Sequence, residues 1–252
     1  KEYLFKTVDF GHEMIEEEAA DIAVELRAVA ACFSISLKNE ARAMSLARQM
    51  KLAAPQLIVV AGGPQAFAPE RLMRKYPHLD YVVSGEGEET FAELLEALAG
   101  GRSADGIKGL AWRSSGRVML NVDRPPKDDL ARHPRAITMK KAAGLSDVVL
   151  FETSRGCRYS CAYCLWSPYP KRYFPMARIR EELGWLLANP KIKRIWFVDS
   201  DFDSDTERAK EILRFIKDNR RHGTMVSGFL SFDHADDELL RLVAELFEEI
   251  PV

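Results

Sequence analysis

The stretch VVLFETSRGCRYSCAYC, Val148 to Cys164, joins an apolar, strand-like run to three closely spaced cysteines. Cys157, Cys161 and Cys164 follow the pattern C-x3-C-x2-C in a loop that leaves this strand. Cysteine thiolates are the usual ligands of iron–sulfur clusters, and three at this spacing can hold three irons of a [4Fe–4S] cluster. The stretch therefore predicts a cluster with one iron left open for a substrate or cofactor.

Two alternatives to an iron–sulfur cluster stay open for the three cysteines. A structural zinc site normally has four protein ligands, and the histidines nearest in the sequence, His133 and His222, are distant. Coincidental packing of three thiols in a polar loop is the second alternative. Cys32 lies in the middle of a predicted strand and is interpreted as a small buried hydrophobic residue. Four cysteines in 252 residues are too few for a disulfide scaffold, which favours a reducing compartment.

Strand-like and helix-like segments alternate on both sides of the cysteines. Apolar runs predict strands at residues 29–37, 56–64, 81–85, 148–156, 194–202 and 225–232. Amphipathic or capped segments predict helices at residues 39–55, 69–77, 88–101, 178–190, 204–223 and 236–251. The last helix but one opens with a predicted capping box, Ser204-x-x-Glu207. A hairpin is predicted to turn at Ser115 and Gly116.

Strands that alternate with helices imply parallel sheets covered by helices. We therefore predict an α/β fold with a Rossmann-like, doubly wound parallel sheet over residues 1–121 and a second α/β domain over residues 148–252. Residues 122–147 carry three prolines and many charges without a clear period. We interpret that stretch as the linker between the two domains.

The cysteine motif has an aromatic residue, Tyr163, directly before its last cysteine, and in this form it resembles the signature of the radical S-adenosylmethionine (SAM) enzymes. In that family the open iron of the cluster binds SAM and delivers the electron that cleaves it. The family fold is a partial (β/α)6 barrel with the cluster loop after its first strand. The resemblance implies that residues 148–252 form the first part of such a barrel.

The same resemblance implies a set of SAM contacts. Tyr163 would lie beside the adenine, and Asp199 and Ser200 would lie near the amino group. Ser227 and Ser231 would approach the ribose or the methionine carboxylate. A solvated loop explains these polar residues about as well.

Small or flexible residues follow three predicted strands in the first half, at the sheet edge where open α/β folds bind ligands. They are Ser34, Ser36, Gly62, Gly63, Pro64, Ser84, Gly85, Glu86 and Gly87. A glycine after a strand is in itself usually a turn. GGP after one strand and SGEGEETF after the next, ahead of the cysteine motif, resemble the cobalamin-binding domain of cobalamin-dependent radical SAM enzymes. The resemblance implies that these residues enclose cobalamin, although the sequence has no D-x-H-x-x-G motif to place a histidine on the cobalt.

The resemblance also implies an activity. The commonest reaction of this class is methyl transfer by way of methylcobalamin to an unactivated carbon or a phosphorus centre. A non-methylating rearrangement or cyclisation is one alternative, and a non-catalytic, cluster- or cobalamin-binding electron-transfer module is another. The implied partners are a small-molecule substrate, such as a natural-product or lipid-like intermediate, and an electron donor such as flavodoxin or ferredoxin.

Composition adds limits on partners and location. A formal net charge of −2 gives no electrostatic reason to expect nucleic acid as a partner. No apolar run is long enough to span a bilayer, and a cytoplasmic protein is expected. Measured against the family pattern, a first strand and helix and three final barrel strands are missing. We therefore expect a chain truncated at both ends.

Overall fold

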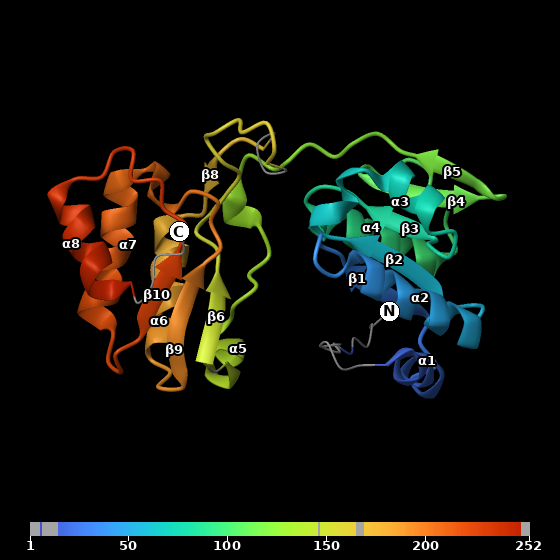
Figure 1. The fold of residues 1–252 in the computed structure, drawn as a ribbon, viewed down its shortest axis with the longest axis horizontal. Helices are drawn as coiled ribbons and strands as arrows, with labels where there is room; N and C mark the ends of the chain where they lie inside the picture. Colours follow the sequence, from blue (N-terminus) through green and yellow to red (C-terminus); the bar gives the residue numbers. More distant parts are fainter. Residues whose placement is uncertain (1–5, 7–14, 146, 165–168, 248–252) are drawn as a thin grey trace. The chain divides into compact units, whose positions relative to one another are not determined.

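The computed structural model describes residues 6, 15–145, 147–164 and 169–247. The chain divides into two compact units, Lys1–Pro126 and Lys127–Val252 (Figure 1). Each unit has its own sheet and its own hydrophobic core. The α/β class predicted from the alternation of strands and helices is confirmed in both units.

The sheet of the first unit has five strands in the order β1-β2-β3-β4-β5. Strands β1 (Ala30–Ser34), β2 (Ile58–Gly62) and β3 (Tyr81–Val83) are parallel. Strands β4 (Leu110–Ser114) and β5 (Arg117–Leu120) continue the sheet as an antiparallel hairpin. Its turn lies at Ser115 and Gly116, as predicted, and both have positive φ angles, 46° and 78°.

Helices pack on both faces of this sheet, because apolar side chains along the strands alternate between two core clusters. Val59 faces the cluster that contains residues of α1 (Glu16–Glu25), α2 (Glu40–Ala53) and α3 (Pro69–Lys75). Val60 faces the other cluster, which contains residues of α4 (Gly87–Gly100). A short 3-10 helix, η1 (Pro64–Phe67), follows β2, and α1 is an addition to the predicted elements.

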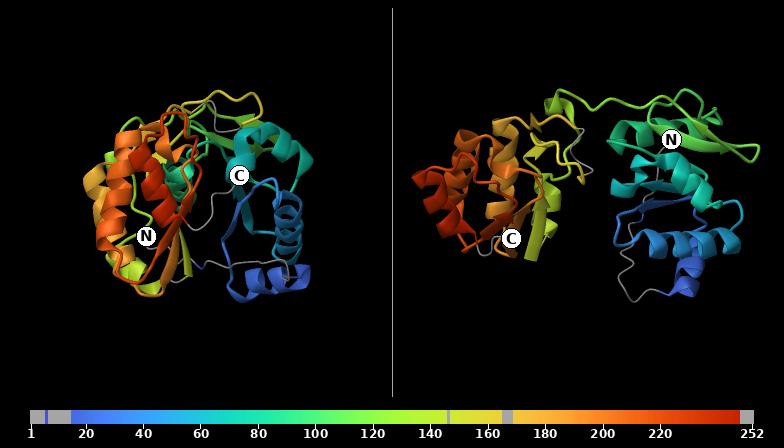
Figure 2. Two further views of the ribbon diagram at one scale, coloured as in Figure 1. Left: turned by 60° about the vertical axis from the view of Figure 1, so that its left-hand side comes forward. Right: turned by 45° about the horizontal axis from the view of Figure 1, so that its top comes forward.

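The second unit is built on three parallel strands in the order β10-β9-β6. These strands are β6 (Asp147–Phe151), β9 (Ile192–Phe197) and β10 (Met225–Gly228). The helices α6 (Met176–Leu187), α7 (Thr206–Asn219) and α8 (Asp237–Leu246) pack on one face of the sheet (Figure 2). Sequential neighbouring strands with a helix after each are the arrangement expected at the start of a (β/α) barrel.

The opposite face of these strands is apolar but open. Leu150 is 65% exposed and Val148 is 52% exposed, whereas Val149 and Phe151 between and beside them are buried against the helices. In a closed barrel, side chains with this orientation point into the interior. Among the helices in the described part of the chain, none is both long and apolar enough to cross a membrane.

Two expectations are corrected by the structure. Residues from Lys127 onward belong to the second unit and contribute Leu130, Ile137 and Ala142 to its core, so only a short part of the predicted linker lies before the boundary. This segment contains η2 (Leu130–Arg132) and α5 (Met139–Gly144), and its three buried anchors are too widely spaced to give a period. The predicted capping box is also wrong, since Asp205 is the N-cap of α7 and accepts a hydrogen bond from the N–H of Arg208 at 3.0 Å.

Candidate functional site

The three cysteines lie on a loop whose two ends are tied together. Strand β7 (Ser154–Arg155) pairs antiparallel with β8 (Arg172–Tyr173) and forms the stem of the loop. Inside the stem, the N–H of Cys157 donates to the carbonyl of Tyr169 at 3.2 Å. The loop therefore begins at the carboxyl end of β6 and closes on itself before α6.

Gly156 lies where the backbone that enters the loop is in close contact with the backbone that leaves it. Its φ is +77°, a conformation that glycine adopts without steric cost. A Cβ atom placed there would lie 2.1 Å from the carbonyl oxygen of Pro170 and 2.6 Å from that of Tyr169. The backbones thus approach more closely than any side chain permits, and glycine is required directly before the first cysteine.

The thiols of Cys157, Cys161 and Cys164 are free and partly exposed. A backbone hydrogen bond of 3.0 Å from Cys164 N to Cys161 O makes a turn between the last two. Among the described residues, no three His, Cys, Asp or Glu side chains are arranged to hold a metal ion. The donor set nonetheless fits a cluster in its chemistry, because three thiols are accessible on one loop with a fixed base. Tyr163, between them, is 91% exposed.

Asp199, predicted to contact SAM, accepts hydrogen bonds from the chain itself. It lies just after β9, is 1% exposed, and accepts hydrogen bonds from the N–H and the hydroxyl of Thr153 at 3.0 Å and 2.7 Å. The hydroxyl of Ser154 donates to the same carboxylate. Asp199 therefore joins the end of β9 to the start of the cysteine-loop stem, a role that the sequence did not reveal because its partners are more than forty residues away.

The three predicted serine contacts have different surroundings. Ser200 is exposed beyond the carboxyl end of β9. Ser227 on β10 is 2% exposed, and its hydroxyl has no hydrogen-bond partner among the described residues. Ser231 is half-buried and accepts a hydrogen bond from Arg158 at 2.8 Å. All three follow or occupy strands that are parallel to β6, so the fold brings them to the strands that carry the loop.

A group of charged residues beyond β9 was missed by the sequence analysis. Arg158, within the cysteine motif, lies 2.9 Å from the buried carboxylate of Asp201. The backbone N–H groups of Ser231 and Phe232 donate to Asp203 at 2.8 Å and 2.7 Å. The sequence signal was present as three acids, D-S-D-F-D, directly after a buried strand.

In the first unit, parallel pairing brings the predicted cobalamin loops to one edge. Ser34, the last residue of β1, is paired in register with Gly62, the last of β2. Gly63 has a φ of +92°, and a Cβ there would lie 2.9 Å from both the carbonyl of Ile35 and the hydroxyl of Ser34. The backbone after β2 therefore packs directly against the backbone after β1.

The loop after β1 is held by an asparagine. The side-chain oxygen of Asn39 accepts hydrogen bonds from the N–H of Ser36 at 2.6 Å and from its hydroxyl at 3.2 Å. The side-chain amide of Asn39 donates to the carbonyl of Ser34 at 3.0 Å. These contacts fix the conformation of both predicted serines before any ligand arrives.

The remaining predicted residues surround the ends of β2 and β3. Pro64 begins η1 directly after Gly63. The N–H of Ser84 donates to the carbonyl of Gly109 at 2.9 Å, and Gly85 has a φ of +74°. Glu86 and Gly87 form the N-cap and first residue of α4. Backbone N–H groups at the start of this helix lie beside the loop, in a position that favours polar or anionic ligand groups.

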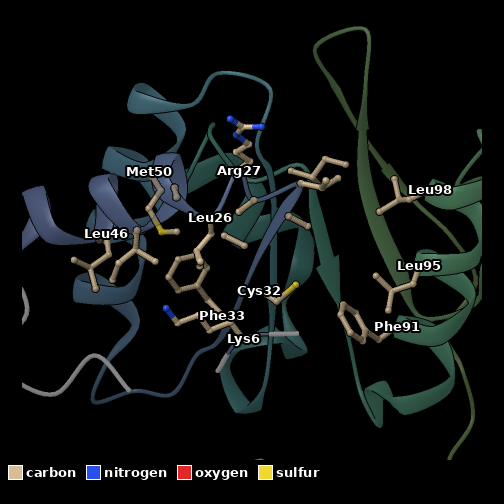
Figure 3. Close-up of a pocket in the computed structure, with 18 of the residues that line it drawn as sticks. Lys6, Leu26, Arg27, Cys32, Phe33, Leu46, Met50, Phe91, Leu95 and Leu98 are labelled. Carbon is tan, nitrogen blue, oxygen red and sulfur yellow. The ribbon is translucent and has the colours of Figure 1, made fainter. Parts of the chain in front are cut away.

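A cavity of about 610 Å³ lies elsewhere in the first unit, between α1, β1 and α4. Its lining is mainly apolar, and Figure 3 shows Cys32 on the side of Phe91 and Leu95 of α4. Cys32 is exposed there, so the prediction of a buried residue is wrong; β1 is the outermost strand of the sheet among the described residues, and its face towards the cavity is left partly uncovered. The apolar surroundings raise the pKa of its thiol. None of the predicted cobalamin residues is among the described residues that line this cavity.

Comparisons with known proteins show what the chain is similar to. The family model of the B12 binding domain matches residues 1–95. An uncharacterized methyltransferase of Pyrococcus horikoshii is 37% identical over 69% of this chain and 40% of its own length. The cobalamin-dependent radical SAM methyltransferase TokK of Streptomyces tokunonensis is 30% identical over 74% of this chain and 29% of its own length. The chain thus spans two fifths or less of these relatives.

A solved structure shows the same fold. The radical SAM methyltransferase TsrM of Kitasatospora setae, with cobalamin and a [4Fe–4S] cluster bound, superposes with a TM-score of 0.72. The match covers 92% of this chain and 50% of that one, at 18% sequence identity. The likeness includes both units.

Proposed function

Because the chain belongs to the cobalamin-dependent radical SAM enzymes, we propose that its protein cleaves SAM reductively and transfers a methyl group to an unactivated carbon or a phosphorus centre. The bound cluster would supply the electron, and cobalamin would carry the methyl group. The single observation that carries the proposal is the cysteine loop. It follows the first strand of a parallel sheet, is closed by the β7–β8 stem, and comes after a B12-binding domain in the sequence.

The residues of the second unit take distinct parts in this proposal. Cys157, Cys161 and Cys164 would hold the cluster. Tyr163 would lie beside the adenine of SAM. Ser200 and Ser227 would make direct contacts with SAM, since the first is exposed and the hydroxyl of the second has no partner among the described residues.

Asp199 and Ser231 would contribute chiefly by fixing the loop. The carboxylate of Asp199 holds Thr153 and Ser154 at the stem. The hydroxyl of Ser231 lies between Arg158 and Asp203, at 2.8 Å and 3.3 Å. A group that is already bonded on several sides positions its neighbours better than it binds a new ligand.

The residues of the first unit would enclose cobalamin. Ser34, Ser36 and Asn39 form one fixed loop at the sheet edge. Gly62, Gly63 and Pro64 form the next, followed by Ser84 to Gly87, and their glycines let the backbone approach a ligand closely. Without a cobalt-binding histidine motif in this sequence, the loops would hold the cofactor through its periphery.

The proposal extends to partners and location. The substrate is a small molecule, such as a natural-product or lipid-like intermediate, which would reach the open apolar face of β6 around Val148 and Leu150. The electron would come from a flavodoxin or ferredoxin, and the protein would act in the cytoplasm.

The test begins with the chain purified without oxygen. Absorbance titration measures cobalamin binding. SAM turnover is then measured in the cobalamin-loaded chain after loading with iron and sulfide, with dithionite as the reductant. We expect saturable cobalamin binding, and both 5′-deoxyadenosine and S-adenosylhomocysteine as products. 5′-Deoxyadenosine without S-adenosylhomocysteine would point to a rearrangement or cyclisation, and cluster assembly without SAM cleavage would point to an electron carrier.

A further inference from the structure

An ion pair connects the cysteine loop to the end of β9. The Nε atom of Arg158 lies 2.9 Å from Oδ2 of Asp201, and the Asp201 side chain is 1% exposed. Neither carboxylate oxygen of Asp201 accepts a well-formed hydrogen bond from a described residue. A buried carboxylate without hydrogen-bond donors depends on a nearby cation, and the Arg158 guanidinium is in direct contact with it.

The other end of the guanidinium is fixed by a second set of contacts. Its Nη2 atom donates to the hydroxyl of Ser231 at 2.8 Å and to that of Tyr159 at 2.9 Å. Ser231 is in turn held by Asp203 through its N–H at 2.8 Å. The hydroxyl of Tyr159 donates to Asp233. Two consecutive residues of the cysteine motif thus dock on the segments that follow β9 and β10.

The returning limb of the loop meets the same residue. The Nζ atom of Lys171 donates to the backbone carbonyl of Asp201 at 2.7 Å. Asp201 therefore contacts the start of the cysteine motif by its side chain and the limb that leaves the motif by its backbone. The bond from Lys171 is to the backbone carbonyl, so a substitution of the Asp201 side chain should leave it in place, and the two contacts can be separated by mutation.

We propose that Arg158 and Asp201 form a positioning pair that sets the conformation of the cysteine loop before a cluster assembles. The inference rests on the proposed function for the identity of the bound group, an iron–sulfur cluster. The positioning itself is inferred from the contacts of Arg158 and Asp201 described above. Arg158 occupies the position directly after the first cysteine, so its anchoring fixes the direction in which the backbone leaves Cys157. Neither residue is assigned a contact with the reacting atoms.

The first experiment uses the full chain without iron, under reducing conditions. Hydrogen–deuterium exchange of the peptide amides of residues 157–164 is compared in the parent chain, Arg158→Gln, Asp201→Asn and the double variant. Because removing one member of a buried pair leaves the other unbalanced, we expect exchange on the order of tenfold faster in each single variant. The double variant should exchange no faster than the faster single variant, which is the signature of a coupled pair.

Controls separate this effect from general loosening. Arg180→Gln removes the exposed ion pair between Arg180 and Glu211, at 2.6 Å, and should leave loop exchange unchanged. Amides of α7 should exchange alike in all variants. Arg158 is partly exposed, so Arg158→Gln is expected to fold even where Asp201→Asn does not. Parent-like loop exchange in Arg158→Gln would overturn the proposal.

The second experiment follows the cluster spectroscopically. After anaerobic reconstitution, Arg158→Gln should lose iron on gel filtration several-fold faster than the parent chain, and Arg158→Lys should restore part of the retention because it keeps the charge. If Asp201→Asn alone changed the EPR response to SAM while loop exchange stayed parental, Asp201 would be a ligand-binding residue and the positioning proposal would be wrong. A parent chain that never binds iron would contradict the proposed function, and the exchange experiment would still decide the pair.

Discussion

Asp199 accepts two hydrogen bonds from Thr153, one from the backbone N–H at 3.0 Å and one from the hydroxyl at 2.7 Å. These bonds join the carboxyl ends of β9 and β6, which lie side by side in the sheet. The cysteine loop leaves the sheet at this junction, so its stem is anchored to two strands of the sheet.

The substitution Asp199→Asn should destabilise the second unit by about 2–4 kcal/mol, because an amide offers one acceptor oxygen where three donors converge. Urea unfolding of the full chain measures the loss. The exposed Asp218 on α7 is the control, and Asp218→Asn should change stability by less than about 0.5 kcal/mol. Equal effects of the two variants would show that the junction carries no special stability.

The substitution Gly156→Ala should abolish iron binding, because the new methyl group overlaps the carbonyls of Tyr169 and Pro170. Gly223→Ala is a matched control. Its φ of +70° is close to that of Gly156, but no atom lies within 4 Å of the added Cβ. The control should therefore show only the conformational cost of about 1 kcal/mol and retain full iron content. Iron content that falls equally in both variants would contradict a steric role for Gly156.

Much of the fold and of the candidate site was predicted from short sequence patterns. The alternation of apolar runs with amphipathic segments predicted the parallel strands, and the turn at Ser115 and Gly116 appeared where the hairpin signal placed it. The cysteine spacing is itself a local feature, which is why it could be recognised without a structure. A resemblance in the order of the glycine loops extended the prediction to the first unit.

Contacts between distant residues could not be predicted in this way. The stem pairs Ser154 with Tyr173, and each of its strands has only two residues. Strands this short show no alternation of apolar and polar residues in the sequence. The role of Asp199 depends on partners 46 and 45 positions earlier. Cys32 has the neighbours of a buried strand in sequence, but its side chain lies on a face of β1 that the described helices leave partly uncovered.

The substitution Asn39→Ala should weaken cobalamin binding by about tenfold, because it frees the loop of Ser34 and Ser36 and adds an ordering cost to binding. Titration of the chain with cobalamin measures the affinity. Gln49→Ala, which removes a 3.2 Å amide contact to Glu16 between α1 and α2, is the control and should leave the affinity unchanged. If Asn39→Ala bound cobalamin as tightly as the parent chain, the prediction that cobalamin contacts this loop would be contradicted.

The substitution Asp236→Asn should lower stability near pH 7 but not in acid. Asp236 caps α8 and lies 2.6 Å from the buried ammonium of Lys210, and the pKa of its carboxyl is lowered, chiefly by the bond from Lys210. A lowered folded-state pKa contributes stability that is present above the unfolded pKa and lost as the pH falls through the folded one. Asparagine keeps the cap, so the variant isolates the charge.

The measurement is the urea midpoint of the full chain between about pH 7 and pH 3, a range that spans the usual pKa of an aspartate. The difference in urea midpoint between the parent chain and Asp236→Asn should narrow as the pH falls towards the lowered folded-state pKa. The neighbouring Asp237, whose side chain is 90% exposed, serves as the control, and Asp237→Asn should show a small, nearly constant gap. A constant gap for Asp236→Asn would contradict a charge effect.

EPR of the chain after anaerobic reconstitution with iron and sulfide and reduction, recorded with and without SAM, tests most directly whether the three cysteines hold a cluster with one open iron. We expect a [4Fe–4S] signal that changes on addition of SAM, is lost when Cys157, Cys161 or Cys164 is replaced by serine, and is retained in Cys32→Ser. A cluster signal indifferent to SAM, or tight stoichiometric zinc in place of iron, would contradict this expectation.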